Sequence, residues 1–172
     1  ENGLSNQKIY YIQKDRRGYM WFLTQEGVDR YDGKYIKHYN FSDDSIKLDS
    51  RIALNWLYMD SGNILWVIGQ KGRIFRYDSQ HDKFELAYVH PELIRNKPQA
   101  FLNYGYLDKS DRIWLCYKDS ITWYDIRTGT TLHMPTPVNG EITAIEQTDD
   151  NHFFIGTGSG LFHARIEKGK LN

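Results

Sequence analysis

The chain has 172 residues and a formal net charge of zero, because 22 Lys and Arg residues balance 22 Asp and Glu residues. Without a basic excess or a run of Lys and Arg, the composition argues against nucleic-acid binding. No apolar run approaches the ~20 residues of a membrane-spanning helix. Cys116 is the only cysteine, which excludes an intramolecular disulfide, and its apolar surroundings indicate a core residue.

The first strands are expected at Ile9–Lys14, Tyr19–Thr24, Val28–Tyr31 and Tyr35–Phe41. These segments are rich in β-branched and aromatic residues, and Asp- and Gly-containing turns separate them. Four short antiparallel strands in about 45 residues are typical of one blade of a β-propeller.

The same unit returns along the chain. Three aspartates precede a tryptophan by six positions, and the anchors Trp21, Trp66, Trp114 and Phe154 lie 45, 48 and 40 residues apart. A degenerate fourth copy has Thr148 in place of the turn aspartate. The residues that we assign to the structural repeat are Asp15, Gly18, Trp21, Asp60, Gly62, Trp66, Asp108 and Trp114.

The sequence therefore predicts an all-β fold of four four-stranded antiparallel repeats, either a small propeller or part of a larger one of about seven blades. We expect one propeller segment over 1–172, with blades near 5–41, 51–89, 100–134 and 141–166. The final residues, 167–172, are polar and are expected to fray.

The apolar pattern of the second strands favours a propeller over a sandwich. Met20–Leu23, Ile64–Ile68 and Ile113–Cys116 are apolar without alternation, which indicates sheets that are covered on both faces. The tryptophans that recur at one blade position are accordingly expected in the core.

Strand alternation places the connections between blades on one face, together with the turns between second and third strands. We expect a ligand at this face, where loops from several blades converge. The candidate ligand-binding residues there are Asn6, Arg51, Gln70, Lys71, Asn103 and Lys118. Trp56 and Tyr104, which lie where first strands begin, are candidates to stack on sugars. An ordinary solvated loop is the alternative for each.

No catalytic residue, cofactor or metal is predicted. No two of the six histidines have the three- or four-residue spacing of a metal-binding pair. The glycine-rich segment Gly156–Gly160 has no following helix to bind phosphate, so we interpret it as a blade turn.

Gly3-Leu4-Ser5-Asn6, followed by Asp15 to Trp21 and then by Gly27 to Gly33, resembles the two-component regulator propeller repeat. This resemblance implies the periplasmic sensor region of a hybrid histidine kinase, in which such repeats detect oligosaccharides. It also implies that the chain begins where a signal peptide has been removed. Kinase chemistry and the membrane anchor would then lie outside these residues.

Three functions follow as hypotheses. The favoured one is a non-enzymatic, oligosaccharide-sensing module of a two-component receptor. The alternatives are a propeller glycoside hydrolase or lyase, and a scaffold that binds a protein partner. Blades at the ends of an open segment would expose apolar faces, so self-association of the chain is also expected.

Overall fold

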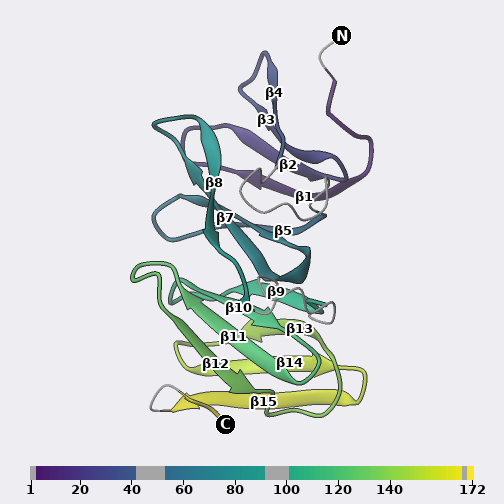
Figure 1. Ribbon diagram of the computed structural model, residues 1–172, viewed down its shortest axis with the longest axis vertical. Helices are drawn as coiled ribbons and strands as arrows, with labels where there is room; N and C mark the ends of the chain where they lie inside the picture. Colours follow the sequence, from purple (N-terminus) through teal and green to yellow (C-terminus); the bar gives the residue numbers. More distant parts are fainter. Residues whose placement is uncertain (1–2, 42–52, 92–100, 168–169) are drawn as a thin grey trace. The chain divides into compact units, whose positions relative to one another are not determined.

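The computed structural model describes residues 3–41, 53–91, 101–167 and 170–172. The chain divides into two compact units, Glu1–Arg95 and Asn96–Asn172, and each is described by itself. In the described residues, every strand belongs to a four-stranded sheet, and Figure 1 labels most of these strands. In the described ranges, no helix has the length and apolar character needed to cross a membrane.

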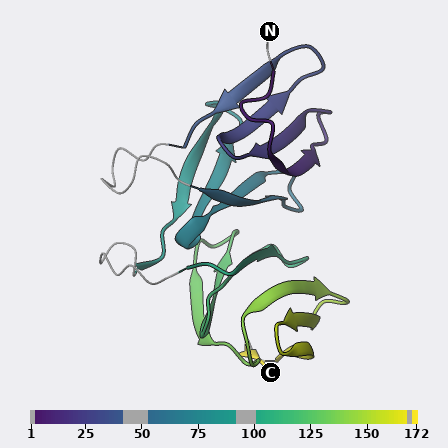
Figure 2. The ribbon, with the colours of Figure 1, turned by 90° about the vertical axis from the view of Figure 1, so that its right-hand side faces the viewer.

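Unit 1 contains two antiparallel sheets, and in each the strands lie in the order of the sequence. The first sheet comprises β1 (Ile9–Lys14), β2 (Met20–Thr24), β3 (Gly27–Tyr31) and β4 (Ile36–Tyr39). The second comprises β5 (Leu54–Met59), β6 (Leu65–Gly69), β7 (Arg73–Asp78) and β8 (Lys83–Tyr88), with a short 3-10 turn, η1 (Gln70–Gly72), between β6 and β7. The two sheets pack against each other (Figure 2).

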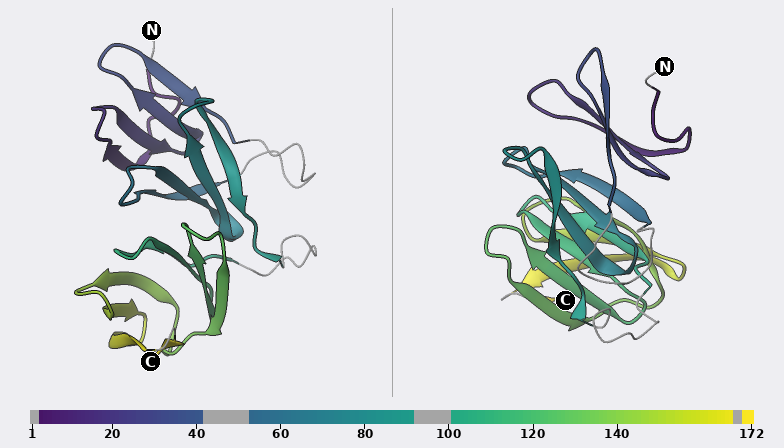
Figure 3. Two further views of the ribbon diagram at one scale, coloured as in Figure 1. Left: turned by 90° about the vertical axis from the view of Figure 1, so that its left-hand side faces the viewer. Right: turned by 45° about the horizontal axis from the view of Figure 1, so that its top comes forward.

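Unit 2 has the same construction. One sheet comprises β9 (Tyr104–Leu107), β10 (Arg112–Cys116), β11 (Ser120–Asp125) and β12 (Thr131–Pro135). The other comprises β13 (Ile142–Gln147), β14 (His152–Thr157), β15 (Gly160–Glu167) and β16 (Lys170–Leu171). Figure 3 shows these sheets in green and yellow. The predicted all-β fold of four antiparallel four-stranded blades is confirmed.

The six-residue spacing between aspartate and tryptophan has a direct structural cause. In the first copy, Asp15 Oδ1 accepts hydrogen bonds from the backbone N–H groups of Arg17 and Tyr19, and Asp15 Oδ2 accepts one from Trp21 Nε1 at 3.0 Å. One carboxylate thus closes the turn between the first and second strands and orients the indole. Such side-chain bonds to nearby backbone amides are typical of aspartate in turns.

The second and third copies repeat this arrangement. Trp66 Nε1 donates to Asp60 Oδ2, and Trp114 Nε1 donates to Asp108 Oδ2, both at 2.8 Å. In the fourth copy, Thr148 Oγ1 instead donates to the carbonyl of His152 at 3.2 Å. The degenerate copy keeps the turn, but it has no tryptophan at this position and therefore no hydrogen bond from an indole to the turn.

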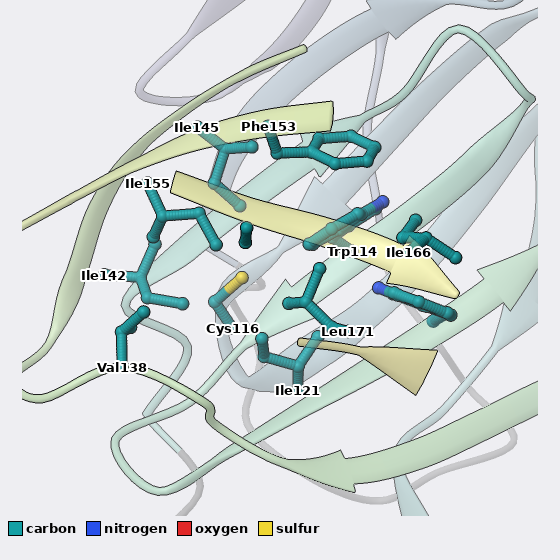
Figure 4. Close-up of a cluster of buried hydrophobic side chains, with 12 residues drawn as sticks. Trp114, Cys116, Ile121, Val138, Ile142, Ile145, Phe153, Ile155, Ile166 and Leu171 are labelled. Atoms are coloured by element: carbon teal, nitrogen blue, oxygen red, sulfur yellow. The ribbon is translucent and has the colours of Figure 1, made fainter. Parts of the chain in front are cut away.

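Each unit has its own apolar core. Trp21, Leu23, Leu57 and Val67 belong to the core of unit 1. The core of unit 2 lies between its two sheets, as Figure 4 shows. Its buried residues are Trp114, Cys116, Ile121, Trp123, Val138, Ile142, Ile145, Phe153, Ile155, Ala164, Ile166 and Leu171. Cys116 is fully buried, and burial raises the pKa of its thiol, so it serves as a core residue.

The expected fraying of the final residues is wrong for residues 170–172. Strand β16 pairs with the end of β15, Ile166 opposite Leu171, and the backbones of Arg165 and Asn172 exchange two hydrogen bonds. Leu171 is also buried in the core of unit 2. Strand β16 supplies the fourth strand of its blade, and its pairing satisfies backbone groups of both β16 and β15.

Candidate functional site

A polar hollow of about 330 Å³ lies in unit 2, between the β10–β11 turn and the connection from β12 to β13. We call it the loop pocket. It is lined by Lys118, Asp119, Thr136, Val138, Asn139, Gly140 and Glu141. Ligand pockets commonly span about 300–1,000 Å³, so the loop pocket has room for a small ligand.

Two hydrogen bonds fix the connection that forms one wall of the loop pocket. Thr136 N donates to the carbonyl of Asp119 at 3.1 Å, which ties the connection to the β10–β11 turn. On the other side, Thr157 Oγ1 donates to the carbonyl of Asn139 at 2.9 Å. Gly140 has φ +89°, and a Cβ there would lie 2.9 Å from Ser159 Oγ. Glycine is therefore favoured at this position by its conformation, and a larger residue would also displace the Ser159 hydroxyl.

The loop pocket offers both hydrogen-bond donors and hydrogen-bond acceptors, some of them charged. Lys118 supplies an ammonium donor, while the carboxylates of Asp119 and Glu141 are acceptors. Thr136 Oγ1 is buried and has no hydrogen-bond partner within the described part of the chain. A ligand rich in hydroxyl groups, which both donate and accept, matches this set of side chains.

Lys118 is the one residue of the predicted ligand set that lines the loop pocket. Asn103 and Tyr104 lie close by in the sheet, because the backbone N–H of Asn103 donates to the carbonyl of Cys116 and Tyr104 pairs with Cys116. Burial raises the pKa of the Tyr104 hydroxyl, which hydrogen-bonds to the backbone of Ile145. Tyr104 thus links β9 to β13.

The other predicted ligand residues belong to unit 1. Gln70 and Lys71 form η1, and Lys71 adopts a left-handed backbone conformation with φ 70°. Asn6 Oδ1 accepts a hydrogen bond from the backbone of Lys8 at 2.8 Å. Trp56 is only 7% exposed, which leaves little of its ring for stacking on a sugar. Arg51 lies outside the described residues.

Sequence reasoning missed most of the loop pocket. Thr136, Asn139 and Glu141 lie in or beside the connection from Pro135 to Gly140, which the sequence pattern indicates only as a link between blades. The available signal was the combination of two prolines with Gly140, which indicates a connection of defined shape. Its proximity to Lys118 depends on the pairing of β11 with β12.

Unit 1 contains a charged cluster around Asp82, in the turn between β7 and β8. Asp82 Oδ1 accepts from the hydroxyls of Tyr39 and Tyr77, both at 2.5 Å, and from Arg30 at 2.8 Å. Lys37 Nζ contacts the other oxygen at 2.5 Å. Burial opposes ionisation of Asp82, but these bonds hold its pKa well below the usual range. We call this set the Asp82 cluster, and it connects β3 and β4 with the second sheet.

The geometry of the Asp82 cluster indicates a structural role, which is to hold the two sheets of unit 1 together. Arg30 lies over the rings of Tyr19, Trp21 and Tyr39, with its guanidinium carbon 4.8 to 5.7 Å from their centroids. Burial raises the pKa of Tyr39, so its hydroxyl stays protonated and keeps donating to Asp82. Within the described ranges, no group of three His, Cys, Asp or Glu side chains is placed to hold a metal ion.

The start of the chain matches the model of a known protein family. Residues 3–26 match the model of the two component regulator propeller family. The resemblance predicted from the first copy is thereby confirmed for this segment, which covers β1, β2 and the turn after them. No curated protein sequence matches the chain.

Solved structures share the fold over nearly the whole chain. The extracellular domain of a hybrid two component system from B. thetaiotaomicron is 23% identical with a TM-score of 0.74, over 99% of this chain and 25% of that one. Virginiamycin B lyase from Staphylococcus aureus is 18% identical with a TM-score of 0.66, over 96% and 59%. A gluconolactonase from Xanthomonas campestris is 14% identical with a TM-score of 0.58, over 95% and 59%.

These identities establish the fold alone. The chain spans about a quarter of the length of the B. thetaiotaomicron domain. The fold is therefore shared with the extracellular domain of a hybrid two component system and with two enzymes, and function has to be argued from the site itself.

Proposed function

We propose that this chain is a ligand-sensing propeller module of an extracytoplasmic two-component receptor and that its ligand is an oligosaccharide. The loop pocket carries the proposal, because Lys118, Asp119 and Glu141 present both donors and acceptors to a hydroxyl-rich molecule. The family match at residues 3–26 and the fold shared with the extracellular domain of a hybrid two component system support it. The receptor would reside in the inner membrane, with this part in the periplasm and a histidine kinase elsewhere.

The mechanism follows from the construction of the loop pocket. Its walls come from the β10–β11 turn and from the connection that enters β13, so a bound ligand would contact one blade and the connection to the next. A ligand shifts an equilibrium between two arrangements only by its different affinity for them. Bridging of the turn and the connection is such a difference, since separation of the two walls would break the contacts with one of them.

The test is a thermal-shift screen of the chain against purified oligosaccharides, followed by calorimetry on any that bind. A ligand specific for the folded state adds about 2.7 kcal/mol at one hundred times its dissociation constant. Lys118→Gln and Glu141→Gln should weaken binding at least tenfold. Lys170→Gln, an exposed lysine on β16, is the matched control and should leave binding unchanged. Equal binding by all three variants would refute the loop pocket as the site.

An enzyme is the second candidate, because two propellers with the same fold are named as a lyase and a gluconolactonase. The same screen separates the two functions when the oligosaccharides are re-examined by chromatography after incubation. An unchanged oligosaccharide supports the sensor. Conversion that depends on Asp119 or Glu141 would support the enzyme instead.

We further propose that the chain associates with a second copy through the exposed face of the last sheet. Phe154 and Leu161 on adjacent strands of this sheet are 41% and 72% exposed. Large apolar side chains in such a position favour contact with another protein surface. Sedimentation velocity over a range of concentrations tests this, and a monomer at every concentration would exclude it.

A further inference from the structure

We propose a second ligand site, in unit 1, that takes an acidic monosaccharide, meaning one sugar ring with a carboxylate group. It is a hollow of about 170 Å³ beside the turns that follow β1 and β5, and we call it the turn pocket. Its lining residues are Asp15, Arg17, Tyr19, Trp21, Met59, Gly62, Asn63, Ile64, Leu65, Tyr77 and Ser79. This site is independent of the loop pocket and does not rest on the proposed function.

The turn pocket is held in shape by contacts between two repeat turns. The backbone N–H of Arg16 donates to Asn63 Oδ1 at 2.9 Å, and the Arg16 guanidinium donates to the carbonyl of Ser61 at 3.1 Å. These bonds place the first-blade turn against the second-blade turn. The ring centroids of Trp21 and Tyr77 lie 4.7 Å apart, with the ring planes inclined at 67° in an edge-to-face contact. The hollow is therefore preorganised, which reduces the cost of binding.

One part of the lining is apolar and aromatic. Tyr19 and Tyr77 are partly exposed, while Trp21 and Leu65 are almost fully buried. Aromatic rings beside a hollow offer a surface on which the C–H face of a sugar ring can lie. The volume limits the ligand, because 170 Å³ is well below the ~300 Å³ at which pockets for drug-sized molecules begin. A single ring fits that limit better than an oligosaccharide does.

The polar part of the lining contains one cation, Arg17, that can receive a ligand carboxylate. Arg17 is exposed, and its guanidinium has no ion pair or hydrogen bond within the described ranges. The nearby Asp15 carboxylate already accepts three hydrogen bonds from its own turn and from Trp21. Arg17 is therefore the available partner for a ligand carboxylate, and guanidinium binds carboxylates with two parallel hydrogen bonds. Asn63 and Ser79 add neutral polar groups for ring hydroxyls.

The experiment is an NMR titration of the 15N-labelled chain with sodium glucuronate, glucose and sodium acetate as probes. The indole N–H of Trp21, assigned by its loss in Trp21→Phe, reports on the turn pocket directly. We expect glucuronate to shift this signal in the millimolar range and to bind at least tenfold more tightly than glucose or acetate. Arg17→Gln should weaken glucuronate binding at least tenfold.

Two control variants make the result specific. Arg127→Gln changes an exposed arginine in unit 2, and Lys170→Gln changes an exposed lysine of β16, so both should leave the glucuronate titration unchanged. Undiminished binding by Arg17→Gln would overturn the role of the guanidinium, and equal binding of acetate would overturn the role of the sugar ring. No movement of the Trp21 signal with glucuronate would overturn the site, whatever the outcome at the loop pocket.

Discussion

The two units contain the same repeat, yet their sheets are joined in different ways. In unit 1 the Asp82 cluster joins β3 and β4 to the second sheet through Arg30, Lys37 and two tyrosine hydroxyls. Aromatic rings fill the space beside it, with Trp21 next to Tyr77 and Phe84. Charged hydrogen bonds and edge-to-face aromatic contacts thus stabilise the same region between the two sheets.

In unit 2 the contact combines an apolar core with hydrogen bonds to a strand backbone. Trp114 packs on Phe153, with ring centroids 4.7 Å apart. Gln147 N donates to the hydroxyl of Tyr106 at 3.2 Å, and Lys109 Nζ donates to the carbonyl of Gln147 at 3.0 Å. The repeat motif thus builds each blade and supplies a tryptophan to the contact between blades, whereas residues outside the motif supply the polar contacts that differ between the two units.

A second contrast lies within unit 2, between the third and fourth copies. Trp114 and Phe154 hold the same register position, opposite Tyr106 and Glu146 respectively. Trp114 is fully buried, while Phe154 is 41% exposed. The two side chains differ in exposure because the face of β10 that carries Trp114 packs against the last sheet.

The largest expected effect tests this contrast directly. Trp114→Ala removes a fully buried indole and leaves Asp108 without one hydrogen bond, so it should lower the free energy of unfolding by about 3–5 kcal/mol. Phe154→Ala, at the equivalent position, should cost less than about 1 kcal/mol, since its ring is partly in water. Urea denaturation of both variants measures the difference. Equal losses would show that register position, rather than burial, sets the energy.

A smaller effect is expected at the Asp82 cluster. The pKa of Asp82 in the folded state lies below its usual value of 3.8. The ionised carboxylate therefore stabilises the folded state above pH 3.8. This contribution is lost as the pH falls from 3.8 towards the pKa of the folded state. Asp82→Asn should therefore make the melting temperature less dependent on pH between pH 5 and pH 3. Asp150→Asn, an exposed aspartate of unit 2, is the control. An unchanged acid dependence in Asp82→Asn would contradict the assigned role.

The smallest effect on folding concerns the exposed face of the last sheet. Leu161→Lys should change the free energy of unfolding by no more than about 0.5 kcal/mol, because the side chain is mostly in water. The same change should abolish self-association, since a charge then lies on the apolar surface. Sedimentation velocity of both proteins checks this. Association that persists in Leu161→Lys would place the contact elsewhere.

Much of the fold could be predicted from the sequence. The first strand was predicted at its observed bounds, Ile9–Lys14, and the other strands of that blade differ by a few residues at their ends. The repeat turns were predictable because Asp15 bonds to groups no more than six residues away. The pairing of Leu171 with Ile166 was not, because a two-residue strand carries too little pattern.

The candidate site was predictable only in part. Lys118 was identified as a residue of a loop face, but its partners Thr136 and Glu141 were not, because they come from a separate connection. Trp56 was expected to meet a ligand, and its burial reflects packing that its neighbours in sequence do not reveal. The turn pocket lay outside the prediction altogether, since it needs two repeat turns side by side.

The sequence by itself therefore determined the repeat, the closing turns and the strand order within each blade. The tertiary structure alone decided that Phe154 is exposed while Trp114 is buried, that Asp82 meets Arg30, and that two hollows form beside the turns. The physical reason is the range of the interactions. A carboxylate that closes its own turn is encoded within six residues, whereas burial and pockets depend on which distant segments lie against each other.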